Sequence, residues 1–281
     1  FYFDTAKAAH PVPSLVTLHG ERHLVNQPNL LIQDILRSAD WVTACSAAVL
    51  EHGRQLVPEI IPHSSVIYNG LSLPSVLPSP LSFDPPVLLC VGRLVAEKGF
   101  DLALEAFTSI VDRFPVVRLA IVGDGPVRSD LEKRASELGI DGLVTFLGQV
   151  IPDNVMAILN RGTIVIIPSR EEAFSLVALE AALMARPVVA TNVGGLPEVV
   201  AQKQTGFLVE QDDSGALAEG IEFLLEHPKT ATEMGKASRL RAQEVFGWKR
   251  FEDSYDLIYR RIICGARSDN NSLTSLSQKT V

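Results

Sequence analysis

The sequence has few cysteines, and their positions exclude two kinds of structural framework. Only three of its 281 residues are cysteine, and they lie far apart at Cys45, Cys90 and Cys264. No spacing among them matches a disulfide scaffold or a zinc site. Cys90 falls in an apolar run, where a small buried hydrophobic side chain is the expected role. A reducing compartment is the simplest location for such a chain, so we expect a cytoplasmic protein.

Basic residues and long apolar runs are also scarce. The chain carries 25 lysines and arginines against 33 aspartates and glutamates, a formal net charge of −8. This balance argues against a nucleic-acid partner, which requires a clustered basic excess. No apolar run approaches the roughly 20 residues of a membrane-spanning helix, and no signal peptide is visible. A peripheral contact with a membrane requires only a local patch and stays open.

The composition that is present favours a folded protein of more than one domain. Hydrophobic residues make up 47% of the chain and charged residues 21%, which suits a globular core. The length suits two compact domains. The chain begins with Phe1 rather than methionine, so we expect a processed product or a fragment of a longer protein.

Strand and helix patterns alternate along most of the chain. The first part contains only about three strands, whereas a doubly wound domain usually has five or six, so the first domain is expected to be incomplete at its N-terminus. In the second part, strands are expected at 87–91, 118–122, 143–147, 164–167, 188–190 and 206–209. Repeated strand–helix units with short loops predict a parallel sheet with helices on both faces.

A proline- and serine-rich stretch without any period, 71–86, is typical of a linker between domains. We therefore divide the chain into a first domain over 1–71, a linker over 72–85, a second domain over 86–247, a helix over 248–265 that returns to the first domain, and a disordered tail over 266–281.

One stretch, 164–200, combines a buried strand with the start of a helix. The residues before Pro168 are apolar, polar residues follow, and helical spacing of apolar residues begins after Ser175. A helix that directly follows a parallel strand presents the free N–H groups of its first turn at the edge of the sheet where ligands bind. The alternative is that Glu171 and Glu172 merely stabilise the start of the helix.

Two basic residues, Arg93 and Lys98, lie in the loop after the first strand of the second domain. The pair could clamp a doubly charged phosphate, Arg93 by its fork and Lys98 as a point charge. The alternative is a pair of solvated loop charges. The glycine turn at 123–126 lacks the third glycine of the dinucleotide fingerprint, so it favours a dehydrogenase only weakly.

Five blocks of sequence occur in an order and spacing that resemble a known family. They are GRLVAEKGFDLALEAF at 92–107, LAIVGDGPVRSDLE at 119–132, VTFLGQV at 144–150, PSREEAFSLVALEA at 168–181 and PVVATNVGGLPEVV at 187–200. Together they are similar to the signatures of retaining glycosyltransferase family 4, the group 1 glycosyl transferases of the GT-B fold. The resemblance implies an α/β protein with two Rossmann-like, doubly wound parallel-sheet domains, of which the N-terminal one is incomplete. It also implies that a nucleotide-sugar is held mainly by the second domain.

The resemblance assigns catalytic roles to individual residues. Arg93 and Lys98 match the family's basic pair on the donor diphosphate. Glu172 and Glu180 match its two glutamates, the first beside the donor sugar and the second on the ribose hydroxyls. His19 matches a histidine that contacts the donor sugar near the reacting carbon. The catalytic residues implied are thus His19, Arg93, Lys98 and Glu172.

A donor-binding set follows from the same resemblance. Backbone N–H groups at 174–177 would receive sugar hydroxyls and phosphate, and Gln149 and Val150 match the loop beside the nucleobase. The donor-binding residues implied are Gly92, Gly123, Gln149, Val150, Phe174, Ser175, Leu176, Val177 and Glu180.

The reaction implied is transfer of a hexose from a nucleotide-diphospho-sugar, expected to be a UDP-sugar, with retention of configuration. The acceptor, whether a sugar, a lipid or a small molecule, is not defined by the sequence. No metal-binding Asp-x-Asp motif is evident, so neither a metal nor a cofactor is expected. Arg93, Lys98 and the helix N-terminus are instead expected to stabilise the leaving diphosphate.

Two departures from the family pattern leave other interpretations open. Ala173-Phe174-Ser175 occupies the position of the family's Gly-Phe-Gly, and each added Cβ narrows the approach to the sugar and disfavours positive φ. The family's N-terminal glycine-rich loop has no counterpart in this sequence. One alternative is therefore a catalytically silent nucleotide-sugar-binding fragment or scaffold, and another is a UDP-sugar epimerase of the GT-B fold.

Overall fold

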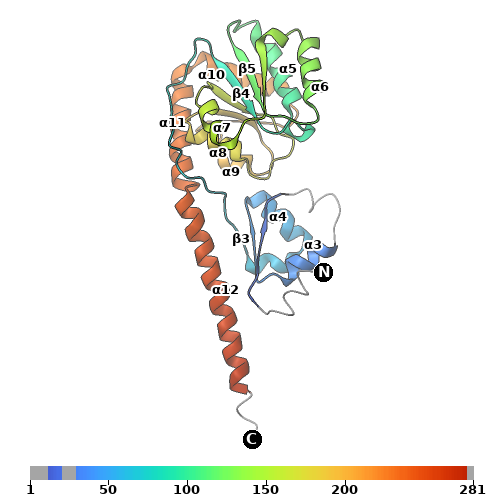
Figure 1. Cartoon of the computed structure of the whole chain (residues 1–281), viewed down its shortest axis with the longest axis vertical. Helices are drawn as coiled ribbons and strands as arrows, with labels where there is room; N and C mark the ends of the chain where they lie inside the picture. Colours follow the sequence, from blue (N-terminus) through green and yellow to red (C-terminus); the bar gives the residue numbers. More distant parts are fainter. Residues whose placement is uncertain (1–11, 21–29, 277–281) are drawn as a thin grey trace. The chain divides into compact units, whose positions relative to one another are not determined.

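The structure, a computed structural model, describes residues 12–20 and 30–276, with the side chains of the last helix up to Cys264 (Figure 1). The chain forms two compact units. The larger unit is Leu71–Gly247, and the smaller one joins Phe1–Gly70 to Trp248–Val281.

The larger unit is built on a six-stranded parallel sheet of strand order β6-β5-β4-β7-β8-β9. Its strands are β4 (Val87–Val91), β5 (Arg118–Val122), β6 (Val144–Gly148), β7 (Ile164–Ile167), β8 (Val188–Thr191) and β9 (Gly206–Val209). The direction in which successive strands are added reverses between β4 and β7, because β5 lies on one side of β4 and β7 on the other. In open α/β sheets, ligands bind outside the carboxyl ends of the strands at such a switch point.

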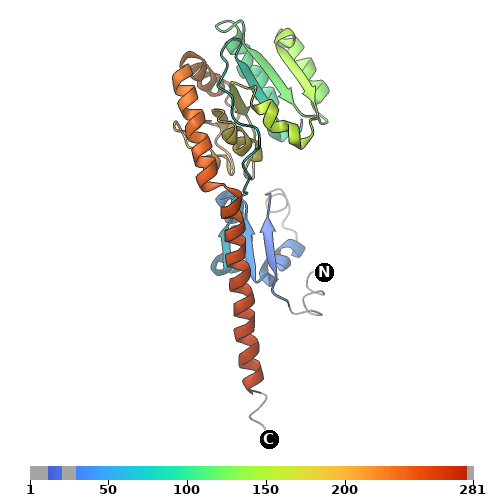
Figure 2. The same cartoon turned by 60° about the vertical axis from the view of Figure 1, so that its left-hand side comes forward.

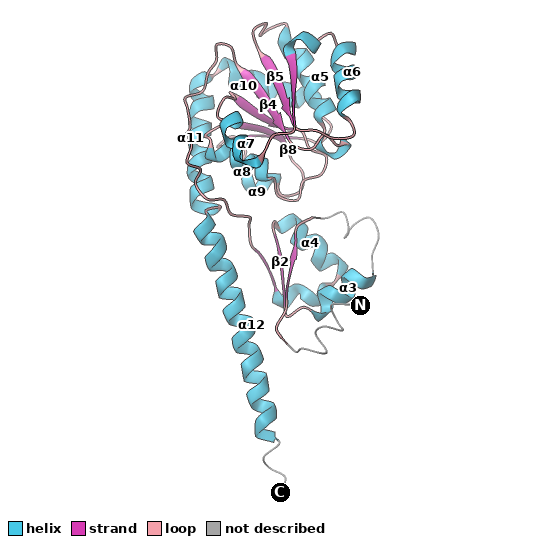
Figure 3. Ribbon diagram, in the orientation of Figure 1, coloured by secondary structure: helices cyan, strands magenta, loops and turns pink. Residues whose placement is uncertain are grey.

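Helices cover both faces of this sheet (Figures 1, 2 and 3). They are α5 (Phe100–Val111), α6 (Arg128–Glu137), α7 (Pro152–Leu159), α8 (Leu176–Leu183), α9 (Leu196–Val199), α10 (Ser214–Glu226) and α11 (Pro228–Val245). Alternate side chains of a strand point to opposite faces, so Leu88 and Cys90 of β4 join residues of α5 and α10 in one apolar core. Strands β7 and β8 are buried along their whole length, which explains the unbroken apolar runs that predicted them.

The smaller unit has a three-stranded parallel sheet of order β1-β2-β3. Its elements are β1 (Leu15–Leu18), α3 (Leu30–Ser38), β2 (Trp41–Ala44), α4 (Ala47–Leu56), the 3₁₀ helix η1 (Pro58–His63), β3 (Ser64–Val66) and α12 (Trp248–Leu276). Helix α12 packs on this sheet, since Ile258 and Ile262 join Trp41 in an apolar cluster. The hydroxyl groups of Tyr255 and Thr17 lie 3.3 Å apart.

The backbone of α12 is helical to Leu276, beyond residue 265, where the sequence led us to expect a disordered tail. A helix that has already formed extends more easily than a new helix nucleates. The polar residues after 265 therefore continue α12 despite their low helix propensity. None of the helices in the described ranges has both the length and the apolar content needed to cross a membrane.

The segment expected to be a linker, 72–85, belongs to the larger unit and is hydrogen-bonded along it. The Ser79 N–H donates to Asn160 Oδ1 at 2.7 Å, and Asn160 Nδ2 donates to Ser79 Oγ at 3.2 Å. The Thr163 hydroxyl donates to Ser82 O at 2.5 Å. Proline and serine content indicated the absence of regular structure correctly, but it could not show that the segment is docked.

A buried arginine, Arg186, holds the same segment. Its side chain is 1% exposed. It donates from Nε to Met184 O and from Nη1 to Gly162 O, both at 2.7 Å, and from Nη2 to Ser79 O. Burial lowers the pKa of Arg186 to about 10, and no carboxylate pairs with it among the described residues. Backbone carbonyls therefore solvate this charge in place of water.

We expect Arg186→Lys to destabilise the larger unit. A lysine has its donors on one nitrogen and cannot reproduce the planar fork that reaches these carbonyls, so at least one of them loses its partner. The free energy of unfolding, measured by urea denaturation, should fall by about 1–3 kcal/mol.

Arg118→Lys is the matched control for this experiment. Arg118 also donates to two carbonyls, Pro115 O at 3.3 Å and Val117 O at 2.8 Å, but it is exposed. Its replacement should change the stability by less than about 0.5 kcal/mol. An equal loss of unfolding free energy in both variants would show that the buried contacts of Arg186 stabilise the protein no more than the exposed contacts of Arg118 do.

Candidate functional site

The ends of two neighbouring strands bring Lys98 and Glu172 together. The loop after β4 leads into a short 3₁₀ helix, η2 (Ala96–Lys98), and the loop after β7 leads into α8. Lys98 Nζ donates to Glu172 Oε2 at 2.6 Å, and the two side chains are 25% and 12% exposed. The Ser169 hydroxyl donates to the same carboxylate oxygen at 3.3 Å. The ion pair is partly desolvated, so its charges interact more strongly than on an open surface.

Backbone contacts hold the two loops at this separation. Gly99 has a φ of 64°, and a Cβ at this position would lie 2.0 Å from Pro168 O. Only glycine therefore permits the end of η2 to lie against the end of β7. On the other side, the Gly195 N–H donates to Glu172 O at 2.9 Å. The loop after β8 thus supports the backbone of Glu172.

Ser175, the N-cap of α8, has the backbone conformation of a glycine. Its φ is 81° and it is 4% exposed. A Cβ disfavours this conformation, yet Ser175 adopts it. A left-handed non-glycine residue costs on the order of 1–3 kcal/mol. The Ser175 hydroxyl offsets part of that cost by accepting a hydrogen bond from the Ala178 N–H at 3.3 Å.

The first turn of α8 presents backbone rather than side-chain groups to a ligand. The N–H groups of Leu176 and Val177 lie in the first turn, where a helix has no carbonyl partner to offer. The ring of Phe174 is buried and packs edge-to-face on Phe246, with 5.6 Å between ring centroids. The side chain of Phe174 therefore belongs to the core. The positive end of the helix and these N–H groups together favour an anion.

Glu180 lies one turn beyond Leu176 on α8 and is half-buried. Burial raises the pKa of its carboxyl group to about 7. The carboxyl has no hydrogen-bond or ion-pair partner among the described residues. A carboxyl group with such a pKa exists near neutral pH in both its ionised form, which only accepts hydrogen bonds, and its protonated form, which can also donate one.

Three residues predicted to bind the donor, Gly123, Gln149 and Val150, lie at the ends of β5 and β6. A Cβ on Gly123 would lie 1.8 Å from Gly92 O, and the Gly123 N–H donates to Gly148 O at 2.8 Å. The ends of β4, β5 and β6 therefore form one continuous backbone surface. Gln149, which is exposed, and Val150, which is half-buried, follow directly after β6.

Two further residues predicted to be catalytic, Arg93 and His19, are exposed. Arg93 lies in the loop after β4, and its guanidinium has no hydrogen-bond or ion-pair partner in the part of the chain that the structure describes. Within the larger unit, the structure thus brings Arg93, Lys98 and Glu172 to the same edge of the sheet. His19 follows β1 in the smaller unit.

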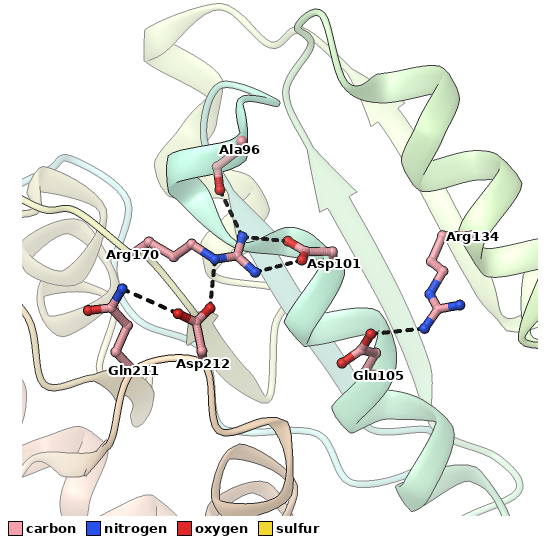
Figure 4. A network of polar contacts seen from close by, with 7 residues as sticks. All are labelled: Ala96, Asp101, Glu105, Arg134, Arg170, Gln211 and Asp212. Carbon is pink, nitrogen blue, oxygen red and sulfur yellow. Dashed lines mark hydrogen bonds and ion pairs between the residues drawn. The ribbon is translucent and has the colours of Figure 1, made fainter.

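Arg170 joins three loops of the larger unit, a role that the sequence did not predict (Figure 4). Its guanidinium donates to both carboxylate oxygens of Asp101 at 2.9 and 2.7 Å, to Asp212 Oδ1 at 2.6 Å and to Ala96 O at 2.9 Å. Burial alone would raise the pKa of Asp101, but the hydrogen bonds from Arg170 outweigh it and hold that pKa below its usual value. The same hydrogen bonds, first those with Asp101, raise the pKa of Arg170.

Little in the sequence could have revealed these contacts. The only signal is an arginine in a polar loop between a buried strand and a helix. Its carboxylate partners lie 69 and 42 residues away along the chain. Their proximity follows from the strand order.

Comparisons with known proteins agree with this architecture. The model of the family described as "Glycosyl transferases group 1" matches residues 78–241. Glycogen synthase from Mycobacterium tuberculosis is 30% identical over 263 residues, which are 89% of this chain and 63% of the relative. The chain therefore spans less than two thirds of the length of that relative.

Solved structures of glycosyltransferases share the fold. Sucrose-phosphate synthase from Thermosynechococcus elongatus superposes with a TM-score of 0.78 at 26% identity, over 94% of this chain and 77% of that one. Anabaena HepE, solved in complex with UDP, gives 0.77 at 24% identity, over 91% of this chain and 73% of that one.

The predicted fold class, an α/β protein of the GT-B type, is thereby confirmed. So is the resemblance to the group 1 glycosyl transferases drawn from the five sequence blocks, all of which lie wholly within the matched residues. Because the family model spans more than half of the sequence, the chain belongs to the group 1 glycosyltransferases.

Proposed function

We propose that this chain binds a nucleotide-diphospho-sugar, with UDP as the nucleotide, and transfers its hexose to an acceptor with retention of configuration and without a metal ion. The observation that carries the proposal is the partly buried Lys98–Glu172 pair, 2.6 Å apart, beside the start of α8. A cation, a carboxylate and free helix N–H groups meet there at the switch point of a parallel sheet. These are the groups that a sugar diphosphate requires, since its phosphates are anionic and its sugar is rich in hydroxyls.

The phosphates have several donors within this unit. Lys98 offers an ammonium group, the exposed guanidinium of Arg93 has no other partner among the described residues, and Leu176 and Val177 offer backbone N–H groups. Lys98 exchanges part of its interaction with Glu172 for the diphosphate when the donor binds. Glu172 then accepts hydrogen bonds from sugar hydroxyls, which a carboxylate next to a phosphate-bound lysine does well.

The nucleotide extends from this point along the ends of the strands. Neighbouring strands lie about 4.8 Å apart, so Gln149 and Val150 after β6 are separated from the loop after β4 by roughly 10 Å. This spacing suits a base beside 149–150, a ribose near Glu180 and phosphates beside Lys98. Anabaena HepE, which shares the fold, was solved with UDP, and we carry that nucleotide over as part of the proposal.

The proposed reaction breaks the bond between the anomeric carbon and the phosphate oxygen. The acceptor hydroxyl forms the new bond on the same face of the sugar, and its proton passes to the leaving phosphate oxygen. Arg93, Lys98 and the N-terminus of α8 stabilise the negative charge that develops on the diphosphate. Glu172 positions the sugar. A contact between His19 and the donor sugar rests on the family resemblance alone.

A binding protein without turnover is the competing proposal, because Ala173 and Ser175 carry side chains beside the sugar. The Ser175 hydroxyl accepts a hydrogen bond from the Ala178 N–H at 3.3 Å, so it is engaged in capping α8. Calorimetry with UDP and GDP followed by assays of hydrolysis of UDP-hexoses separates the two. Binding of UDP with donor hydrolysis supports the transferase, whereas binding without any hydrolysis or transfer supports the competing proposal.

Lys98→Ala should weaken UDP binding by roughly tenfold to a hundredfold, as expected for the loss of a charged hydrogen bond. The substitution also leaves the Glu172 carboxylate without its cation, which repels the diphosphate. The dissociation constant is measured by isothermal titration calorimetry. Lys133→Ala is the control, since Lys133 is an exposed lysine paired with Glu137 on α6. An unchanged dissociation constant for Lys98→Ala would rule out the phosphate site.

Glu180→Gln should stabilise the larger unit at alkaline pH and leave it unchanged at acid pH. The pKa of Glu180 in the folded chain is about 7, above its ordinary value of 4.5, so the folded state holds the proton more tightly than the unfolded state. Above pH 7 the folded protein bears the full cost of a buried charge, and this cost disappears as the pH falls from 7 to 4.5. The variant should therefore gain up to about 3 kcal/mol in free energy of unfolding at pH 8 and nothing at pH 4.

Urea denaturation at the two pH values measures this difference. Glu219→Gln, at an exposed position of α10, should show no pH-dependent gain. A gain for Glu180→Gln of the same size at pH 4 and pH 8 would contradict the assignment of a raised pKa to this carboxyl group.

A further inference from the structure

We propose that Arg170 is a positioning residue, which holds Lys98 at the distance from Glu172 that donor binding requires. The inference rests on the proposed function, because it concerns how the same site is built. Arg170 lies two residues before Glu172 and donates to carbonyls of the two residues before Lys98. One residue thus connects the backbones that carry both members of the ion pair, and Figure 4 shows its side-chain bond to Ala96 O.

The contacts between Arg170 and η2 come from both its backbone and its side chain. The Arg170 N–H donates to Glu97 O at 2.7 Å, and Nη1 donates to Ala96 O at 2.9 Å. The Glu171 N–H makes a longer bond of 3.4 Å to the same Glu97 oxygen. The two η2 residues that precede Lys98 are therefore both hydrogen-bonded to the loop that carries Glu172.

Helix η2 needs such external support. It has only three residues, and its own hydrogen bonds are those of the Lys98 N–H to Val95 O at 3.0 Å and of the Gly99 N–H to Ala96 O at 3.1 Å. Short 3₁₀ segments have poor hydrogen-bond geometry and little stability of their own. The position of the Lys98 ammonium consequently depends on what η2 is bonded to.

Two carboxylates fix the guanidinium in the required orientation. Asp101, in the first turn of α5, accepts from Nη1 and Nη2, and Asp212, in the loop before α10, accepts from Nε at 2.6 Å. The Arg170 side chain is 28% exposed, so the contacts are partly shielded from water. A planar fork with donors on three nitrogens can hold two carboxylates and a carbonyl at once, whereas a lysine cannot.

Arg170→Lys, which keeps the charge and loses the fork, tests this role in two measurements. The first is hydrogen exchange of the amides in segment 95–99 of the ligand-free protein, which we expect to accelerate roughly tenfold as η2 loosens. The second is the dissociation constant for UDP, which we expect to rise about fivefold to tenfold. In the Lys98→Ala background the same substitution should have little further effect on UDP binding, because Arg170 acts through Lys98.

Arg113→Lys is the matched control. Arg113 also donates to two carboxylates of another element, Glu222 and Glu226 of α10, with no contact to η2. This variant should change neither the exchange of segment 95–99 nor the affinity for UDP. Asp101→Asn is a second, milder variant, since it removes one charge but keeps the shape of the partner, and it should shift both measurements in the same direction.

Each outcome decides the proposal. Faster exchange of 95–99 with a loss of affinity that disappears in the Lys98→Ala background supports it. Unchanged exchange overturns it, and so does a loss of UDP affinity that persists in full without Lys98. If the unmodified protein binds neither UDP nor GDP, the proposed function fails, and the exchange measurement alone then decides whether Arg170 holds η2 in position.

Discussion

The pairing of β4 with β7 is the constraint on which the candidate site depends. These strands are distant in sequence but are hydrogen-bonded neighbours, with Leu88 opposite Ile164 and Leu89 opposite Val165. Their loops therefore leave the sheet side by side, and Lys98 from one reaches Glu172 from the other. Any other partner for β4 would separate the two charges. The ion pair is thus a consequence of the strand order.

Two ionisable groups of the larger unit, one buried and one half-buried, differ in how the fold surrounds them. Arg186 and Glu180 both lack a counter-ion among the described residues. Arg186 is surrounded by carbonyl acceptors, and its pKa of about 10 keeps it charged at neutral pH. Glu180 has no donors in the described structure, and its pKa rises to about 7. The fold itself supplies the hydrogen-bond acceptors of Arg186. We propose that a ligand supplies the partner of Glu180, in agreement with the role on the ribose hydroxyls that the family resemblance implies.

The sequence predicted the strands of the larger unit well, because strands buried on both faces leave unbroken apolar runs. It did not predict strand order, so the contacts of Arg170 with Asp101 and Asp212, which depend on that order, were missed. The roles of Lys98 and Glu172 came from the family resemblance, since spacing alone left solvated loop charges as an alternative. The residue type alone could not show that Ser175 adopts a positive φ, a conformation that a Cβ disfavours and that a cap hydrogen bond to the Ala178 N–H accompanies here.

A crystal structure of the chain with UDP tests the central claim most directly. The account predicts a phosphate oxygen within hydrogen-bond distance, about 2.7–3.1 Å, of Lys98 Nζ and of an N–H group in the first turn of α8, with the base beside Gln149. Phosphates bound at any other edge of the sheet, with the Lys98–Glu172 pair unchanged, would contradict it.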